Sequence, residues 1–284
     1  MFVLRVVTCV SAVALAIAAS PASIEKRAPL QQRVYDQLLY HFKYASSAYA
    51  SSCAHPNGQH LVKTFSNKAT NTQSYIARDD AKEEFIVAFR GSTDCTDAKT
   101  EKNSKLVKLS GPGYFNFSGP DPPLVHKGFL AAHNTVAQNI QDTLKAQLQA
   151  NNGSHALYTI VCVGHDIGGS LAALAGIALR YVLFDNIVQT YTFGQPRTGD
   201  ITWAFLHGVV VHTNDGVPKL IPGGLTGYVH HPVEYWNYRD PPSANTTKKC
   251  RDREDALEDE ECSVSVKTNT YFDIPYNKAF CSAK

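Results

Sequence analysis

The sequence predicts an α/β fold in which a mostly parallel central sheet is covered by helices on both faces. Runs typical of strands alternate with runs of helical spacing, which is the pattern of such a fold. Residues 85–89 are nearly all apolar, as expected of a strand that is buried on both faces. The 284 residues show no internal repeat and no Pro/Gly-rich linker that would divide the chain into two cores.

Each element follows from local periodicity and from the residues that end it. Helical spacing predicts helices over 30–50, 127–150 and 170–183, and a further helix near 200–207. Short apolar runs predict strands at 60–65, 73–78, 84–89, 157–163, 187–193 and 209–213. Residues 94–123 are polar and then rich in Gly and Pro, which predicts a long loop.

Composition excludes several classes of protein. The chain has 27 Lys+Arg, 25 Asp+Glu and 44% hydrophobic residues. This apolar fraction excludes a disordered chain, and the near-neutral charge argues against nucleic acid as a partner.

The first residues have the pattern of a targeting segment. Arg5 precedes an apolar run over 6–19, and small residues and Lys26-Arg27 follow it. The run suits the apolar region of a signal peptide and is too short to span a bilayer, although an N-terminal membrane anchor is the alternative. We therefore expect a signal peptide and short propeptide at 1–27, and a single secreted domain at 28–284 without a transmembrane segment.

Six of the seven cysteines remain when Cys9 is removed with the signal peptide. A secreted chain favours disulfides. The predicted pairs are Cys53 with Cys281, joining the two ends of the domain, and Cys250 with Cys262. Cys162 lies in an apolar strand and is expected to be a buried free thiol, and Cys95 has no evident partner.

Two further surface features accompany the cysteines. Three sequons predict glycosylation at Asn116, Asn152 and Asn245. The charge run at 252–261 is interpreted as a solvated loop, with metal binding as the alternative. Since nothing there specifies a coordination geometry, we expect no metal and no cofactor.

The most informative segment is Gly164-His165-Asp166-Ile167-Gly168, which follows an apolar strand and precedes an Ala/Leu-rich helix. A strand, a G-x-nucleophile-x-G turn and a helix form the nucleophile elbow of α/β-hydrolases. The elbow directs the next amide, that of Ile167, into an oxyanion hole. The predicted fold class is therefore an α/β-hydrolase fold.

Several separated motifs make the chain resemble the fungal lipase-type family, the class 3 lipases. They are the segments at 45–49, 89–92, 125–129, 164–168, 192–199, 211–218 and 231–236. The resemblance implies the family's fold, an oxyanion role for Ser92, a triad acid at Asp215 and the family's bridge between Cys53 and Cys281. It also implies a lipid, ester or other apolar ligand, and we expect a monomer.

Two positions depart from the family pattern. Asp166 stands where the family has its nucleophilic Ser, and Asn277 stands where it has its catalytic His. The degenerate triad therefore contains Asp166, Asp215 and Asn277. A Ser nucleophile needs a hydroxyl and a base, and neither Asp166 nor Asn277 supplies them. We therefore predict a lipase-like protein without Ser-hydrolase activity, in which the Asn277 amide bridges the two carboxylates.

Two enzymatic alternatives stay open. A carboxylate can itself attack carbon, so Asp166 could serve as the nucleophile of an epoxide hydrolase or dehalogenase. That chemistry needs a base to activate water, for which the candidates are His207, His212, His230 and His231. The other alternative is a residual carboxylic ester hydrolase that uses unrecognised residues.

The segment after Phe89-Arg90-Gly91 bears on ligand access. In the family this segment carries an amphipathic helix that opens at lipid surfaces. Residues 93–105 here have almost no apolar side chains. Because interfacial binding requires an apolar face, we do not expect this segment to sense a lipid surface.

Overall fold

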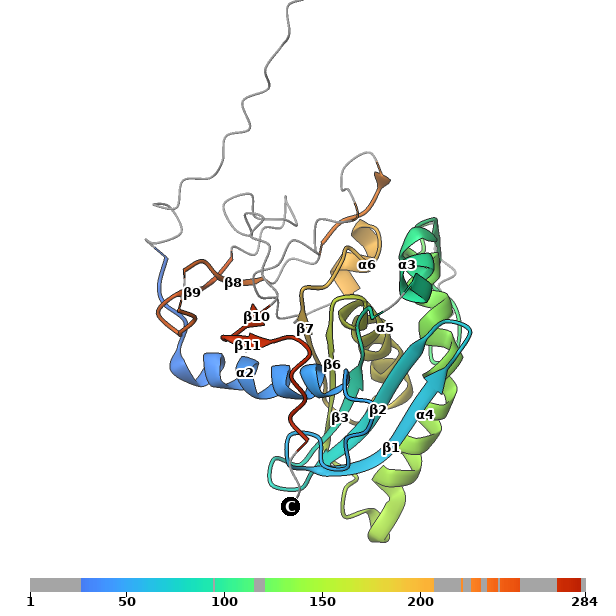
Figure 1. Cartoon of the computed structure of the whole chain (residues 1–284). Coiled ribbons are helices and arrows are strands. Elements are labelled where there is room, and N and C mark those ends of the chain that lie inside the picture. Colours follow the sequence, from blue (N-terminus) through green and yellow to red (C-terminus); the bar gives the residue numbers. More distant parts are fainter. Residues whose placement is uncertain are drawn as a thin grey trace, which may run out of the picture.

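A computed structural model describes residues 27–93, 95–114, 121–206, 221, 226–230, 234–239, 241–250 and 270–281. Figure 1 shows a central sheet with helices on both sides. The five strands lie in the order β1-β2-β3-β6-β7. They span β1 His60–Asn67, β2 Thr72–Asp79, β3 Glu84–Phe89, β6 Thr159–His165 and β7 Val188–Phe193.

The sheet changes from antiparallel to parallel pairing at β3. β1, β2 and β3 pair antiparallel, whereas β3, β6 and β7 pair parallel. The short connections 68–71 and 80–83 permit only antiparallel pairing, because a parallel pair needs a long crossover. The predicted α/β-hydrolase fold is confirmed, with the addition that its first strands form an antiparallel meander.

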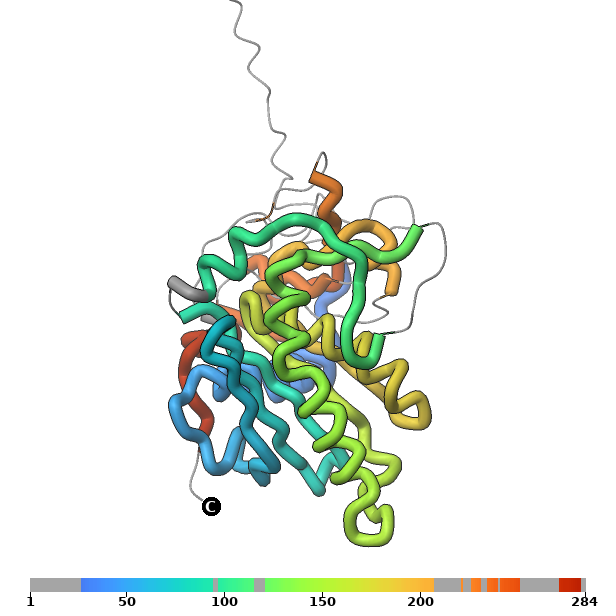
Figure 2. The backbone as a smooth tube through the Cα atoms, turned by 90° about the vertical axis from the view of Figure 1, so that its right-hand side faces the viewer, coloured from blue at the N-terminus to red at the C-terminus, as the bar shows by residue number. Residues whose placement is uncertain are grey.

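Three helices supply the two covering layers. α4 (Lys127–Gly153) and α5 (Ile167–Val182) pack on one face of the sheet, and α2 (Gln32–Ser47) packs on the other. Figure 2 shows α4 lying across the front of the strands. Successive side chains of a strand point to opposite faces. Accordingly Phe85 and Val87 join the core beneath α4 and α5, whereas Ile86 and Ala88 join the core beneath α2.

Shorter elements surround this sandwich. They are α3 Cys95–Lys102, β4 Leu106–Lys108, β5 Leu124–His126, α6 Ile201–Leu206, β8 Tyr235–Asn237, β9 Thr247–Lys249, β10 Thr270–Tyr271 and β11 Ile274–Pro275. β4 pairs with β5, β8 with β9 and β10 with β11, all antiparallel. Among the described residues, no helix combines the length and apolarity needed to cross a membrane.

The prediction of a loop over 94–123 is wrong in its first part. Residues 95–102 form α3 and residues 106–108 form β4. α3 has Asp97 in its first turn and Lys99 and Lys102 in its last, so its charges complement the helix dipole. Helical periodicity gave no signal there because the helix has no apolar face. The predicted strand at 209–213 lies outside the described residues, as do residues 1–26 of the predicted signal peptide and propeptide at 1–27.

Cys53 and Cys281 form the predicted disulfide, with their Cα atoms 5.1 Å apart. Pro56 and Cys281 also form an isolated antiparallel β-bridge, and the Asn57 amide donates a hydrogen bond to the Phe280 carbonyl. Cys250 is also disulfide-bonded, but Cys262 lies outside the described residues, so that pairing stays a prediction. Cys162 is a buried free thiol, as predicted, and burial raises its pKa.

Candidate functional site

Asp166 occupies a strained backbone turn between β6 and α5. Its φ of 58° and ψ of −133° lie outside the regions that most residues adopt. Such a conformation costs on the order of 1–3 kcal/mol and persists only where its surroundings enforce it. The turn therefore has the backbone geometry that the sequence predicted for a nucleophile elbow.

Two glycines permit the close packing around this turn. A Cβ atom at Gly164 would lie 2.0 Å from the carbonyl oxygen of Gly168. A Cβ atom at Gly168 would lie 2.4 Å from the carbonyl oxygen of Phe89. Both distances are far below contact with backbone atoms that cannot move aside, so any side chain at either position would disrupt the elbow.

The carboxyl group of Asp166 is nearly buried and is held by backbone amides. Asp166 is 9% exposed, and its Oδ2 accepts a hydrogen bond of 2.8 Å from the Ser92 amide. The Ile167 amide and the Ser92 hydroxyl also lie on the side of this carboxyl where they favour its charged form. Ser92 and Ile167 are the two residues predicted to form an oxyanion hole, and in this structure both interact with Asp166 itself.

The environment of Asp166 opposes its ionisation. Burial raises the pKa of the Asp166 carboxyl above its usual value, and the charge of Asp97 adds to this effect. The hydrogen bonds from Ser92 and Ile167 lower the pKa and offset part of the shift. Asp166 is therefore a carboxyl group that is harder to ionise than an ordinary surface aspartate.

Comparison with known proteins places this elbow in a family. Residues 86–224 match the family model described as Lipase (class 3). The chain belongs to the class 3 lipase family. The curated relatives include a lipase from Rhizopus niveus, 29% identical over 246 residues that cover 80% of this chain and 56% of the relative. This chain thus spans little more than half the length of that relative.

Other similar proteins agree with this assignment. Secreted mono- and diacylglycerol lipase A from Penicillium cyclopium is 29% identical over 254 residues, covering 81% of this chain and 78% of the relative. A triacylglycerol lipase from Penicillium expansum superposes with a TM-score of 0.75 at 22% identity, covering 89% of this chain and 99% of that one. The second comparison shows that the fold is shared.

The residue before Asn277, Tyr276, contacts the elbow. Tyr276 stacks on His165, with ring centroids 4.9 Å apart, and His165 precedes Asp166. The Asn277 side chain is exposed, and within the described residues it makes no hydrogen bond to Asp166. The predicted hydrogen bond from the Asn277 amide to Asp166 is therefore not formed. The second predicted partner of this amide, Asp215, lies outside the described residues.

The histidines near the elbow are already engaged. The Nδ1 atom of His165 lies 2.7 Å from the Tyr49 hydroxyl. The Nε2 atom of His230 lies 3.0 Å from the carbonyl oxygen of Gln195, which makes that nitrogen a donor. His207, His212 and His231, the other candidate bases, lie outside the described residues.

Sequence analysis missed the carboxyl groups that α3 brings to the elbow. The Ser92 hydroxyl donates a hydrogen bond to Oε1 of Glu101. The Thr93 amide donates to Oδ2 of Asp97 across 2.7 Å, which ties the start of α3 to the segment after Ser92. The four-residue spacing of Asp97 and Glu101 was the available signal, but without a predicted helix it could not be used.

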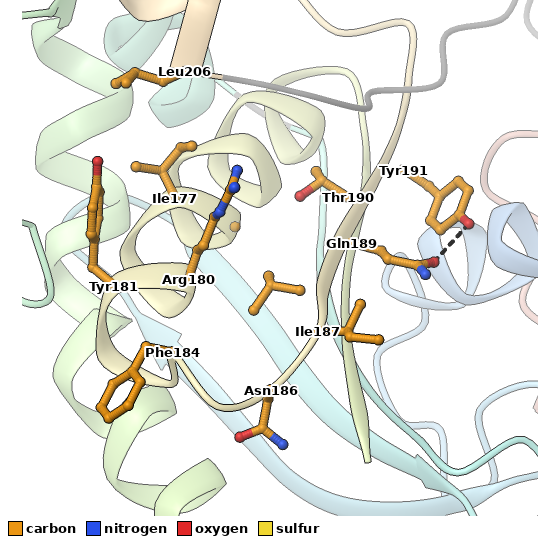
Figure 3. Close-up of a pocket in the computed structure, with 12 residues that line it drawn as sticks. Ile177, Arg180, Tyr181, Phe184, Asn186, Ile187, Gln189, Thr190, Tyr191 and Leu206 are labelled. Carbon is orange, nitrogen blue, oxygen red and sulfur yellow. Dashed lines mark hydrogen bonds between the residues drawn. The ribbon is translucent and has the colours of Figure 1, made fainter. Parts of the chain in front are cut away.

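A large surface cavity lies elsewhere. It has a volume of about 730 Å³ and follows β7 and the second half of α5 (Figure 3). Its lining includes Tyr181, Phe184 and Ile187, all exposed, and does not include Asp166 or Ser92. This cavity is therefore distinct from the elbow.

Two of the three predicted glycosylation sites are exposed. Asn152 and Asn245 are exposed, so both sequons are accessible, whereas Asn116 lies outside the described residues. Within the described part of the chain, no group of three or more His, Cys, Asp or Glu side chains has an arrangement that could hold a metal. The acidic segment 252–261 lies outside it.

Proposed function

We propose that this class 3 lipase family member is a secreted protein, with residues 28–284 as its mature domain, that has lost Ser-hydrolase activity and binds an acyl or other apolar ligand. The hydrogen bond from the Ser92 amide to Asp166 Oδ2 carries the proposal. The relatives described as lipases supply the expectation of an acyl ligand, and those described as secreted supply the expectation of an extracellular location.

The chemistry of Asp166 opposes ordinary ester hydrolysis in two ways. A carboxyl group lacks the alcohol hydroxyl that a catalytic His activates as a nucleophile in Ser hydrolases. In addition, the negative oxygen that forms during ester cleavage needs free amide donors. Here the Ser92 amide already donates a hydrogen bond to Asp166 Oδ2, and an ionised Asp166 would repel the negative oxygen of the substrate. Asp166 therefore removes both the Ser nucleophile and a donor that would stabilise the negative oxygen.

The composition of α3 supports ligand entry without interfacial activation. The helix has the sequence CTDAKTEK, in which most side chains are polar or charged. Asp97 in its first turn and Lys99 and Lys102 in its last turn interrupt any continuous apolar stripe. A helix without an apolar face gains little from a lipid surface. We therefore propose that the ligand is taken up as a monomeric molecule from water.

An assay with a matched variant tests the loss of activity. The purified chain and its Asp166→Ala variant are compared on p-nitrophenyl butyrate and p-nitrophenyl palmitate. We expect both to match the buffer rate. Turnover by the wild type that Asp166→Ala lacks would contradict the proposal. Binding of a fluorescent fatty acid is measured in parallel, and an absence of saturable binding would refute the ligand-binding part.

A second candidate function is an Asp-nucleophile hydrolase. It is favoured by the same hydrogen bond, because the Ser92 amide holds the Asp166 carboxyl in a fixed position, as a carboxylate nucleophile requires. Attack would form an alkyl ester on Asp166 and open the epoxide ring, whose oxygen takes a proton. Water must then cleave that ester at the carboxyl carbon, which requires a base. The test is epoxide turnover that Asp166→Asn abolishes.

A further inference from the structure

We propose that Asn152 is a site of spontaneous deamidation, in which the Gly153 amide nitrogen displaces ammonia from the Asn152 side chain, and that a glycan on Asn152 prevents this reaction. The first part needs only the turn at the end of α4. The second part rests on the proposed function, because a glycan at the sequon Asn152-Gly153-Ser154 requires that the chain is secreted.

An asparagine that is followed by glycine can close a ring with its own backbone. The Gly153 nitrogen loses its proton and forms a bond to the side-chain carbon Cγ of Asn152. The bond from Cγ to Nδ2 breaks, and Nδ2 takes up a proton and leaves as ammonia. Water then opens the succinimide ring at either of its carbonyl carbons, which leaves aspartate or isoaspartate at position 152. Glycine favours the attack because it has no side chain to hinder it.

The surroundings of Asn152 and Gly153 leave room for ring closure. Asn152 is exposed, and a Cβ atom at Gly153 would meet no atom outside the adjoining residues nearer than 3.9 Å. Asn152 has a φ of 56° and a ψ of 33°. Its Cα–C bond must rotate to bring the Gly153 nitrogen up to Cγ. The open space around Gly153 permits this rotation.

Local contacts hold the turn that contains Asn152. The Ser154 amide donates to the Asn151 carbonyl, and the Ala156 amide donates to the Gly153 carbonyl. Figure 2 shows this end of α4 projecting from the body of the protein. Hydrogen bonds within a single exposed turn open at a low cost in free energy. The turn can therefore reach the reactive conformation without disturbing the core.

The chain carries one other Asn-Gly pair, Asn57-Gly58, in contrasting surroundings. Asn57 has a φ of 49°, close to that of Asn152, but both residues of this pair are half-buried. The Gly58 amide donates to the His55 carbonyl across 3.0 Å, and the Asn57 amide donates to the Phe280 carbonyl across 2.6 Å. Because the attacking nitrogen is already hydrogen-bonded, we expect Asn57 to resist deamidation.

A glycan would act on the same nitrogen that leaves during deamidation. N-linked glycans attach to the side-chain nitrogen of asparagine, which is Nδ2 of Asn152 here. With a sugar bonded to it, Nδ2 cannot leave as ammonia, and the bulk of the sugar opposes closure of the ring. Glycosylation and deamidation therefore compete for one atom, and only unglycosylated molecules should change with time.

The product should fit this turn less well than asparagine does. Asparagine is one of the few residues that adopt the left-handed region readily, whereas isoaspartate adds one atom to the backbone. Either product also places a negative charge near the C-terminal end of α4, where the helix dipole disfavours it. Deamidation thus changes both the charge and the backbone of the turn.

Mass spectrometry of the unglycosylated full chain tests the first part. The chain is produced in bacteria and incubated at pH 8.5 and at pH 5.0, then digested in acid, where the ring does not form. We expect Asn152 to convert about tenfold or more faster than Asn57 at pH 8.5, since two hydrogen bonds must break at Asn57. Conversion should be slower at pH 5.0, because the Gly153 nitrogen must lose its proton. Equal rates at the two sites would overturn the proposal.

The unfolded chain shows whether the folded surroundings cause this difference. Incubation at pH 8.5 after reduction in urea removes the hydrogen bonds at both sites. We expect Asn57 and Asn152 then to convert at similar rates. A tenfold difference that persists in urea would overturn the assigned cause.

Two variants complete the test. Gly153→Ala places a methyl group beside the attacking nitrogen and should slow conversion at Asn152. An unchanged rate would overturn the ring mechanism. Ser154→Ala removes the sequon and keeps the Asn152-Gly153 pair. Produced in a yeast host, it should convert at the rate of the bacterial protein, whereas wild type from the same host should stay unchanged. Absence of a glycan on Asn152 of this wild type, or its conversion at the Ser154→Ala rate, would overturn the second part alone.

Discussion

The Ser92 amide donates a hydrogen bond of 2.8 Å to Oδ2 of Asp166, so the residue at the tip of the elbow uses a donor that an ester substrate would need. Aspartate extends one atom beyond serine and carries two oxygens. This extra reach brings Oδ2 to the Ser92 amide while the backbone keeps its elbow conformation. One side chain thus removes the nucleophile and engages the predicted oxyanion hole.

Restoring both missing groups should restore ester hydrolysis. The double variant Asp166→Ser, Asn277→His supplies a hydroxyl and a base, and it frees the Ser92 amide. We expect p-nitrophenyl butyrate turnover well above that of either single variant, because removing one triad member leaves at most about 10³–10⁴-fold acceleration over water. Equal rates in the double and single variants would show that Asn277 does not occupy the position of the catalytic base.

Replacing Asp166 with Asn should stabilise the protein in a pH-dependent way. Burial raises the pKa of Asp166 in the folded protein, so ionisation there costs stability. The free energy of unfolding of the wild type therefore falls as the pH rises through the raised pKa of Asp166. Asn carries no charge at any pH, so the variant does not show this fall. One pKa unit corresponds to about 1.4 kcal/mol. The unfolding midpoint of Asp166→Asn should exceed that of the wild type more at pH 7.5 than at pH 3.5.

A control separates this effect from a general change in net charge. Asp142→Asn alters an exposed carboxyl on α4 that accepts a hydrogen bond from the Gln138 side chain of the same helix. We expect its midpoint to follow the wild type within experimental error at both pH values. A stabilisation of Asp166→Asn that is equal at pH 3.5 and 7.5 would contradict the assigned cause.

Most of the fold could be predicted from the sequence because its elements carry strong local signals. Residues 85–89 read as a buried strand, and the Gly-rich turn before the apolar helix at 167–182 identified the elbow. α3 could not be predicted, because its stability comes from polar contacts such as Thr93 with Asp97. The contact of Ser92 with Asp166 joins residues 74 positions apart, which local periodicity cannot reveal.

The disulfide between Cys53 and Cys281 should contribute strongly to stability. It closes a loop with a sequence separation of 228 residues, and it limits the freedom of the unfolded chain. We expect the double variant Cys53→Ala, Cys281→Ala to lower the free energy of unfolding by about 2–5 kcal/mol, as measured by chemical denaturation. A single variant of either cysteine serves as the control and should show a loss of similar size, because each opens the same loop. An unchanged denaturation midpoint in the double variant would contradict the expectation.

Adding one methyl group at either elbow glycine should destabilise the fold. In Gly168→Ala the new Cβ would lie 2.4 Å from the Phe89 carbonyl oxygen, so β3 and the start of α5 would have to separate. We expect a loss of about 3 kcal/mol or more in the free energy of unfolding, at the upper end of typical point substitutions. Gly153→Asn is a matched control at a glycine with φ of +76°, because a Cβ there meets no atom closer than 3.9 Å and Asn tolerates this conformation. Equal losses in the two variants would show that backbone conformation, rather than the close approach of β3 to α5, accounts for the requirement for Gly168.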